Sequence, residues 1–286
     1  MIGPLSDTRI VNLGLNVPGP LAAARLTGFG ASVTKVEPPT GDFLAMGAPE
    51  WYQTLTAGQE ILTLDLKTEA GQAGLAELLA SADLLLTTQR PAALKRLSLD
   101  WDTLHAHCPR LCQVAIVGHP APDQDLPGHD VTYLAHHGLL RPPALPLTLG
   151  ADILGAEQAV STALALLSST ERTGEGAYVE VPLADAATAL AQPLVHGLTA
   201  PGGTLGGGVP GYGIYAAQDG HIAVAALEPR FLTRLTEELG IPNASHEDLA
   251  RVFETRPAAA WEAWAKERDL PIVAVRHCGP TNPTEE

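Results

Sequence analysis

The chain has 286 residues, of which 45% are hydrophobic and 17% are charged, and its formal net charge is −15. The apolar content supplies a buried core, and 28 glycines and 24 prolines are too few for a collagen-like or disordered chain. This acidic balance argues against function classes that need clusters of basic residues, namely nucleic-acid binding and electrostatic membrane anchoring.

Cysteine content and apolar runs predict the compartment. The three cysteines, Cys108, Cys112 and Cys278, have no framework spacing, which indicates a reducing environment. The amino end lacks the basic and apolar regions of a secretory signal, and no apolar run reaches the roughly 18 residues that a membrane span needs. We therefore expect a cytoplasmic protein without a membrane segment.

The first half of the sequence alternates short apolar runs with helical patterns. A helix is predicted from Pro18 to the residue before Gly30, and another carries apolar side chains at Leu75, Leu78 and Leu79. The predicted strands span residues 9–15, 33–37, 61–66, 83–88 and 112–118. Apolar strands separated by amphipathic helices are typical of βαβ units, which build a parallel sheet covered on both faces.

The second half begins with one long helix over residues 152–172, ended by Gly174. A strand and a helix over residues 184–198 follow, and then a glycine-rich segment. Beyond it, the sequence predicts a hairpin with Asp219-Gly220 at the turn, a helix that begins at Pro229, two further helices and a strand.

These elements predict an α/β fold with a large Rossmann-like domain and a smaller α+β domain. We place the large domain at residues 1–199, a Gly/Pro-rich linker at 200–211, the small domain at 212–278 and a tail at 279–286.

Two cofactor hypotheses find little support in the sequence. The first strand-to-helix turn, GLNVPGP, lacks the G-x-G-x-x-G pattern that brings backbone close to a pyrophosphate, so a nicotinamide or flavin cofactor is not expected. His105, His107, Cys108 and Cys112 match no structural zinc spacing, and we expect no metal.

His129 and Asp130, in the segment PGHDVTYLA, are candidate catalytic residues. They open a helical stretch, where the helix dipole stabilises a carboxylate and disfavours an imidazolium. A neutral imidazole is what a general base requires. The alternative is that Asp130 caps the helix and that His129 is an ordinary loop residue.

Two further carboxylates have similar alternatives. Asp152 stands at the beginning of the long helix, where it is either a functional acid or an N-cap. Glu228 follows an apolar strand and precedes Pro229. It is either partly buried with a raised pKa or an exposed first-turn residue that interacts with the helix dipole.

Segments along most of the chain, in order, resemble the family III CoA-transferase and alpha-methylacyl-CoA racemase family. They include RIVNLGLNVPGPLAAARLTGFGASVTKVEPPTGD, LTLDLKTEAGQAGLAELLASADLLLTTQRPAALKRLSL, CPRLCQVAIVGH, PGHDVTYLA, ERTGEGAYVEVPLADA and GIYAAQDGHIAVAALEPRF. The resemblance implies an enzyme that acts on acyl-CoA thioesters, with CoA as part of the substrate and no separate cofactor.

The racemase branch, which the G-H-D and L-E-P-R-F spellings favour, implies specific roles. His129 and Asp152 fall on its two acid/base positions, and Glu228 falls on the glutamate that supports the histidine. Inversion at C2 of a 2-methylacyl-CoA needs one base on each face of the carbon. A backbone N–H at a helix start near Asp130 or Asp152 is a plausible donor to the enolate oxygen.

The transferase branch implies a different residue. There the aspartate that forms an acyl-anhydride corresponds to Asp130, and CoA moves between carboxylic acids. In either branch Arg90 and Arg96 match positions that hold the CoA phosphates, which suits the bidentate geometry of arginine.

The sequence also departs from the family pattern. Ala57, Gln59 and Glu60 stand where cations usually precede L-D-L-K, and the chain ends where family members continue. The resemblance implies a homodimer, although an interlocked one is not expected. A catalytically idle, shortened paralogue is the third alternative.

Overall fold

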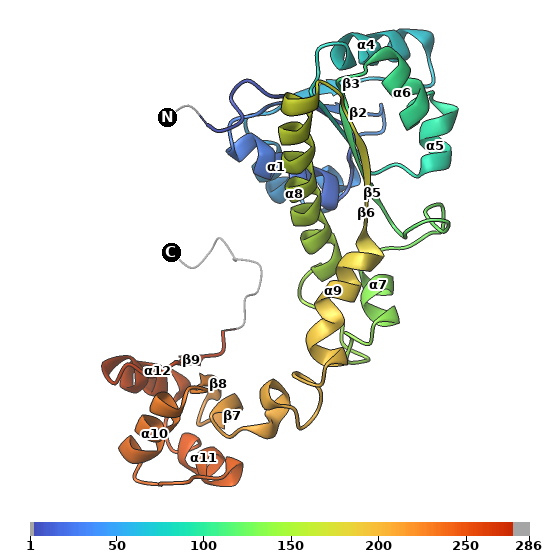
Figure 1. The fold of residues 1–286 in the computed structure, drawn as a ribbon. Coiled ribbons are helices and arrows are strands. Elements are labelled where there is room, and N and C mark those ends of the chain that lie inside the picture. The colour runs from blue at the N-terminus through green and yellow to red at the C-terminus, as the bar shows by residue number, and fades with distance from the viewer. Residues whose placement is uncertain (1–2, 277–286) are drawn as a thin grey trace. The chain divides into compact units, whose positions relative to one another are not determined.

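The computed structural model describes residues 3–276 (Figure 1). Its contacts divide the chain into two units, the first ending at Ala191 and the second beginning at Gln192, and each is described by itself. In the described residues, no helix has the length and apolar character to cross a membrane.

The first unit is built on a six-stranded parallel sheet in the order β3-β2-β1-β4-β5-β6. The strands are β1 (Arg9–Asn12), β2 (Ser32–Glu37), β3 (Glu60–Thr63), β4 (Leu84–Thr87), β5 (Cys112–Val117) and β6 (Tyr178–Pro182). The chain order reverses between β1 and β4. In open parallel sheets, ligands bind at such a switch point, outside the carboxyl ends of the strands.

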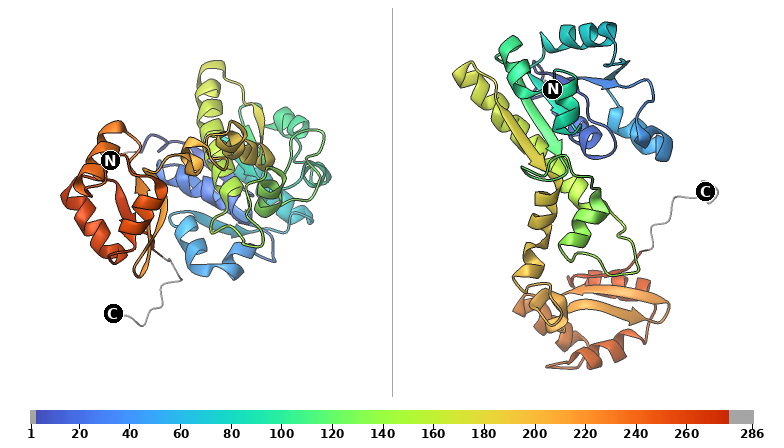
Figure 2. Two further views of the ribbon diagram at one scale, coloured as in Figure 1. Left: turned by 90° about the horizontal axis from the view of Figure 1, so that it is seen from below. Right: turned by 90° about the vertical axis from the view of Figure 1, so that its right-hand side faces the viewer.

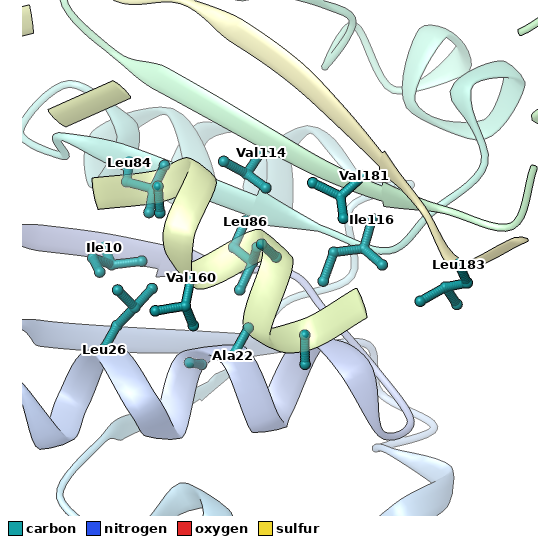
Figure 3. Close-up of a cluster of buried hydrophobic side chains, with 14 of the residues drawn as sticks. Ile10, Ala22, Leu26, Leu84, Leu86, Val114, Ile116, Val160, Val181 and Leu183 are labelled. Carbon is teal, nitrogen blue, oxygen red and sulfur yellow. The ribbon is translucent and has the colours of Figure 1, made fainter. Parts of the chain in front are cut away.

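Helices cover both faces of this sheet (Figures 1 and 2). The helices are α1 (Pro18–Gly28), α2 (Phe43–Gly47), α3 (Pro49–Thr56), α4 (Glu69–Leu79), α5 (Pro91–Arg96), α6 (Trp101–His107), α7 (Asp130–His136), α8 (Gly150–Thr173) and α9 (Leu183–Val195), which runs across the division between the units. On one face, α1 and α8 pack through small residues such as Ala22 and through Val160 onto strand residues such as Leu86 (Figure 3). On the other face, a second core cluster includes Leu75 and Leu104 from α4 and α6.

The predicted α/β fold class is confirmed, and two strands end three residues earlier than predicted. β1 ends at Asn12 instead of residue 15, because the side chains of Asn12 and Lys35 bind the backbone of Gly14. β3 ends at Thr63 instead of residue 66. The long helix α8 ends as predicted at Gly174, whose φ of 80° is left-handed.

The second unit carries a three-stranded antiparallel sheet in the order β7-β8-β9 (Figure 2). Its elements are a short π-helical segment (Thr204–Gly208), β7 (Tyr212–Ala217), β8 (Gly220–Ala225), α10 (Pro229–Glu238), α11 (His246–Phe253), α12 (Ala258–Glu267) and β9 (Ile272–Ala274). Trp261 and Phe253 lie at the centre of its core. The hairpin turn is one residue earlier than predicted, at Gln218-Asp219.

The predicted domain boundaries stay predictions. The predicted tail 279–286 lies outside the described residues.

Candidate functional site

A cavity of about 230 Å³ lies at the carboxyl ends of β1, β4, β5 and β6. Its lining brings together His129, Asp152 and Arg90 from three separate segments, with Asn16 and Tyr133 beside them. A larger apolar groove lies between α4 and α6 and contains none of the predicted site residues. The cavity at the strand ends is therefore the candidate active site.

His129 is the N-cap residue of α7. Its backbone N–H donates to Oγ1 of Thr132 at 3.0 Å, and the Thr132 hydroxyl donates to the His129 carbonyl at 2.7 Å. These bonds fix the backbone from which the imidazole extends at the cavity. The start of α7 therefore fixes the position of His129. His129 is not an ordinary loop residue, which was the alternative interpretation of the sequence.

Asp130 neither caps its own helix nor lines the cavity, although the sequence suggested one of these two positions. It is the first residue of α7 and only 3% exposed, and it is absent from the cavity lining. Its Oδ1 accepts hydrogen bonds from the backbone N–H groups of Ala151 at 2.7 Å and Asp152 at 3.0 Å. Asp130 therefore caps α8 and not α7, because it supplies an acceptor to N–H groups of the first turn that lack partners inside the helix.

Asp152 is the third residue of α8, and the N-cap of that helix is Leu149. The alternative that Asp152 serves as the N-cap is therefore wrong. Its carboxyl group is at the cavity, and burial raises its pKa from 3.8 to about 7, with a smaller contribution from the negative charge of Asp130. Near neutral pH both the protonated and the ionised form of this group are populated.

Tyr133 was missed by sequence reasoning. Its ring is buried, and Gly118 and Gly128 leave the space that it fills, because a Cβ on either would lie within 3.0 Å of the ring or its hydroxyl. Burial, with the neighbouring Asp152 charge, raises the pKa of Tyr133 to about 12. The sequence held one signal: Tyr133 lies in the first turn of the helix that follows the candidate His129.

The two arginines differ in position. Arg90 is the N-cap residue of α5 and lines the cavity, whereas Arg96 lies in the last turn of the same helix, away from the lining. Both are exposed, and within residues 3–276 neither forms an ion pair. Their positive charges are free to meet an anionic ligand.

Glu228 belongs to the second unit, as the N-cap residue of α10. Its carbonyl accepts the N–H groups of Phe231 and Leu232, and its side chain is exposed. Of the two alternatives, the exposed carboxylate is the one observed, because the residue caps the helix through its backbone and leaves the side chain outside. Its predicted role beside His129 stays a prediction.

The first strand-to-helix turn is closely packed at two glycines. A Cβ at Gly14 would lie 2.7 Å from the Cα of Gly19, so this glycine pair serves the close packing of the loop against the start of α1. Across residues 3–276, no group of three or more His, Cys, Asp or Glu side chains is arranged to hold a metal ion.

Known proteins are similar to this sequence over most of its length. The chain is 32% identical to the alpha-methylacyl-CoA racemase of Homo sapiens, over 90% of this chain and 74% of that protein. It is 30% identical to the succinyl-CoA–D-citramalate CoA-transferase of Chloroflexus aurantiacus, over 88% of this chain and 69% of that protein.

Solved structures show the same fold. A CAIB/BAIF family protein from Brucella suis superposes with a TM-score of 0.82 at 22% identity, covering 97% of this chain and 85% of that chain. The model of CoA-transferase family III matches residues 5–281. The resemblance seen in the sequence is confirmed, and the chain belongs to CoA-transferase family III.

Proposed function

We propose that this chain racemises C2 of a 2-methylacyl-CoA thioester, with His129 and Asp152 as the two acid/base groups. The thioester lowers the pKa of the C2 proton, so that a side-chain base removes it. One group takes the proton from one face and leaves an enolate, and the other, in its protonated form, returns a proton to the opposite face. The reverse direction exchanges the two roles.

The observation that carries this proposal is the cavity that His129 and Asp152 both line, in which burial raises the pKa of Asp152 to about 7. A two-base exchange requires one protonated and one deprotonated group at the same pH. A carboxyl group with an ordinary pKa would be ionised almost completely near neutrality and would be a poor acid.

Negative charge on the enolate oxygen also needs a hydrogen-bond donor. The sequence suggested backbone N–H groups at a helix start, yet those of Ala151 and Asp152 already donate to Asp130. Tyr133 lines the cavity, and its raised pKa keeps the hydroxyl protonated. We therefore assign Tyr133 as a donor to the thioester oxygen.

The test is incubation of one epimer of a 2-methylacyl-CoA with the protein in D2O, followed by NMR of the C2 proton. We expect loss of the C2 proton signal and formation of the other epimer. His129→Ala should abolish exchange and leave CoA binding nearly intact. His136→Ala, at the other end of the same helix, is the matched control because His136 lies outside the cavity.

Three other outcomes of this experiment would contradict the racemase proposal or the role of His129. CoA binding without exchange in the wild type would contradict the racemase proposal and favour CoA transfer. Loss of both binding and exchange in His129→Ala would contradict the assigned role of His129. A wild type that neither binds nor exchanges would be the catalytically idle paralogue.

CoA transfer is the second candidate, and the identity with a CoA-transferase supports it. The nucleophile must attack the thioester carbonyl, and Asp130 is buried outside the cavity with its Oδ1 held by two N–H groups. We therefore assign this role to Asp152 in place of Asp130. Only the covalent route gives an acyl-anhydride, which hydroxylamine traps; Asp152→Asn should abolish trapping.

The homodimer and the cytoplasmic location remain proposals that rest on the family resemblance and on composition. Sedimentation velocity at several protein concentrations tests the first, since a monomer at micromolar concentration would contradict it.

A further inference from the structure

A buried ion pair lies behind the loop that joins β1 to α1. The side chain of Lys35 is 0% exposed, and that of Asp42 is 0% exposed. Lys35 Nζ donates to Asp42 Oδ2 at 2.9 Å and to the carbonyl of Gly14 at 2.9 Å, and it lies 3.3 Å from Oε1 of Glu37. All three protons of the ammonium group therefore have an acceptor close by.

Asp42 in turn holds the next part of the same loop. Its Oδ1 accepts the backbone N–H of Asn16 at 2.9 Å and that of Leu44 at 3.0 Å. One oxygen of the carboxylate thus serves the loop and the start of α2, and the other serves Lys35. The pair fixes the loop at two points, the Gly14 carbonyl and the Asn16 N–H.

Side chains that follow β4 fix the loop at two more points. Thr88 Oγ1 accepts the N–H of Leu15 at 3.0 Å, and Gln89 Nε2 donates to the carbonyl of Leu13 at 2.7 Å. Four consecutive residues of the loop therefore have a backbone group bound by a side chain from another segment. Such a loop has little freedom to change conformation when a ligand binds.

Asn16 is the residue that this network holds in place. Its φ of 64° is left-handed, a conformation that is costly for most residues and more accessible to asparagine. Asn16 is exposed and lines the same cavity as His129 and Asp152, and within residues 3–276 its side-chain amide forms no hydrogen bond. A fixed backbone with a free amide at the cavity is suited to ligand binding.

Stability alone does not account for the ion pair. A buried pair must offset the desolvation of two charges, and apolar residues of similar volume often stabilise a core equally well. Apolar side chains would, however, leave the Asn16 N–H and the Gly14 carbonyl without their present partners. The charged side chains of Lys35 and Asp42 are therefore explained by the loop backbone that they hold in position.

We propose that the Lys35–Asp42 ion pair positions Asn16 so that its side-chain amide donates a hydrogen bond to an oxygen of the bound acyl-CoA. Asn16 contacts the substrate, and Lys35 and Asp42 are positioning residues that act through it. The choice of ligand rests on the proposed acyl-CoA function, whereas the positioning of the loop does not.

Two substitutions at Asn16 test the contact. Asn16→Gly removes the amide and retains the left-handed backbone, and Asn16→Asp keeps the shape and replaces the donor with an acceptor. We expect each to lower kcat/KM for C2 proton exchange by about tenfold, the effect of losing one hydrogen bond. Activity at the wild-type level in both variants would overturn the contact.

Asp42→Asn tests the positioning. We expect faster hydrogen–deuterium exchange in a peptide that covers the loop, and a loss of kcat/KM similar to that of Asn16→Gly. The double variant Asn16→Gly/Asp42→Asn should lose little more than either single variant, because both changes act on one contact. Additive losses, or an unchanged exchange rate of the loop, would overturn the positioning role.

Tyr52→Phe is the matched control. The Tyr52 hydroxyl donates to Glu37 in the same buried network at 2.6 Å, but it makes no hydrogen bond to the loop. Loop exchange and kcat/KM should stay at the wild-type level. If Asp42→Asn folds poorly, the Asn16 variants still decide the contact, because Asn16 is exposed.

Failure of the proposed function gives a separate result. If the wild type shows no C2 exchange, affinity for an acyl-CoA thioester replaces kcat/KM as the readout for the Asn16 variants. If the wild type binds no thioester either, the substrate contact is overturned together with the proposed function, and hydrogen–deuterium exchange alone decides the positioning.

Discussion

Oδ1 of Asp130 accepts a hydrogen bond from the backbone N–H of Asp152, with 3.0 Å between the two atoms. Asp130 directly follows His129 in the chain, so this bond ties the start of α7 to the start of α8. One buried carboxylate thereby sets the separation of the two residues proposed as acid and base. The second oxygen of Asp130 is buried without a partner, so its negative charge also acts on Asp152.

Asp130→Asn should fold and retain proton exchange. The asparagine Oδ1 can accept the same two N–H groups, and the amide NH2 takes the place of the unpartnered oxygen. Removal of the charge should lower the pKa of Asp152, since the Asp130 charge contributes to its rise. We expect the limb of the pH–rate profile that belongs to Asp152 to move to lower pH.

Asp130→Ala should destabilise the protein by about 2–4 kcal/mol, because two N–H groups at the start of α8 lose their acceptor. Chemical denaturation of both variants measures this difference. Complete loss of activity in Asp130→Asn, with the fold intact, would contradict the positioning role and restore Asp130 as a candidate nucleophile.

Asp152→Asn should stabilise the protein at high pH and abolish exchange. The pKa of Asp152 is about 7 in the folded chain and near 3.8 when unfolded, so the folded state binds more protons between these values. Stability due to this group therefore falls as pH rises through that window. The gain from Asp152→Asn should be absent near pH 4 and reach at most about 4 kcal/mol above pH 7.

Thermal unfolding at pH 4 and pH 8 measures the pH dependence. Asp7→Asn, which changes an exposed carboxylate of the same unit, is the control and should show little difference between the two pH values. Equal effects of Asp152→Asn at both pH values would contradict the raised pKa.

Tyr133→Phe should lower kcat by about 100-fold with little change in KM, as expected for loss of one donor to a developing oxyanion. The ring packing against Gly118 and Gly128 is retained, so the unfolding temperature should change little. With a tyrosine pKa near 12, the wild-type rate should show no tyrosine limb below pH 10. Unchanged kcat would contradict the assignment of this donor.

Patterns local in sequence predicted most of the fold. Short apolar runs between helical patterns predicted the parallel sheet, and Gly174 ends α8 in the left-handed conformation that glycine favours. The strand ends were less predictable, because the end of β1 depends on Lys35, which is 23 residues beyond Asn12 in sequence. Side-chain bonds of this kind leave no local pattern.

Part of the cavity lining was predictable from the sequence, whereas Tyr133 and Asn16 were not. Resemblance directed attention to His129 and Asp152, which line one cavity. Asp130 looked like a cap of its own helix or a nucleophile, and only the folded chain brings it to the start of a helix 20 residues later. Whether a carboxylate faces a cavity or a helix end is a property of tertiary packing.

Arg90→Ala and Arg96→Ala should each weaken binding of an acyl-CoA by about tenfold, the effect of losing a hydrogen bond to a charged group. Both guanidinium groups are exposed and lack an ion-pair partner within residues 3–276, so a phosphate replaces only water. The residual binding should depend less on salt, because screening acts on the charge that was removed.

Calorimetric titration with the thioester at low and high salt measures both effects. Arg172→Ala is the control: it lies 20 residues after Asp152 on α8, about 30 Å along the helix, and should change neither affinity nor salt dependence. If Arg90→Ala weakens binding and Arg96→Ala does not, the phosphates lie beside the cavity and only Arg90 holds them. Unchanged affinity in both variants would mean that the phosphates bind elsewhere on the chain.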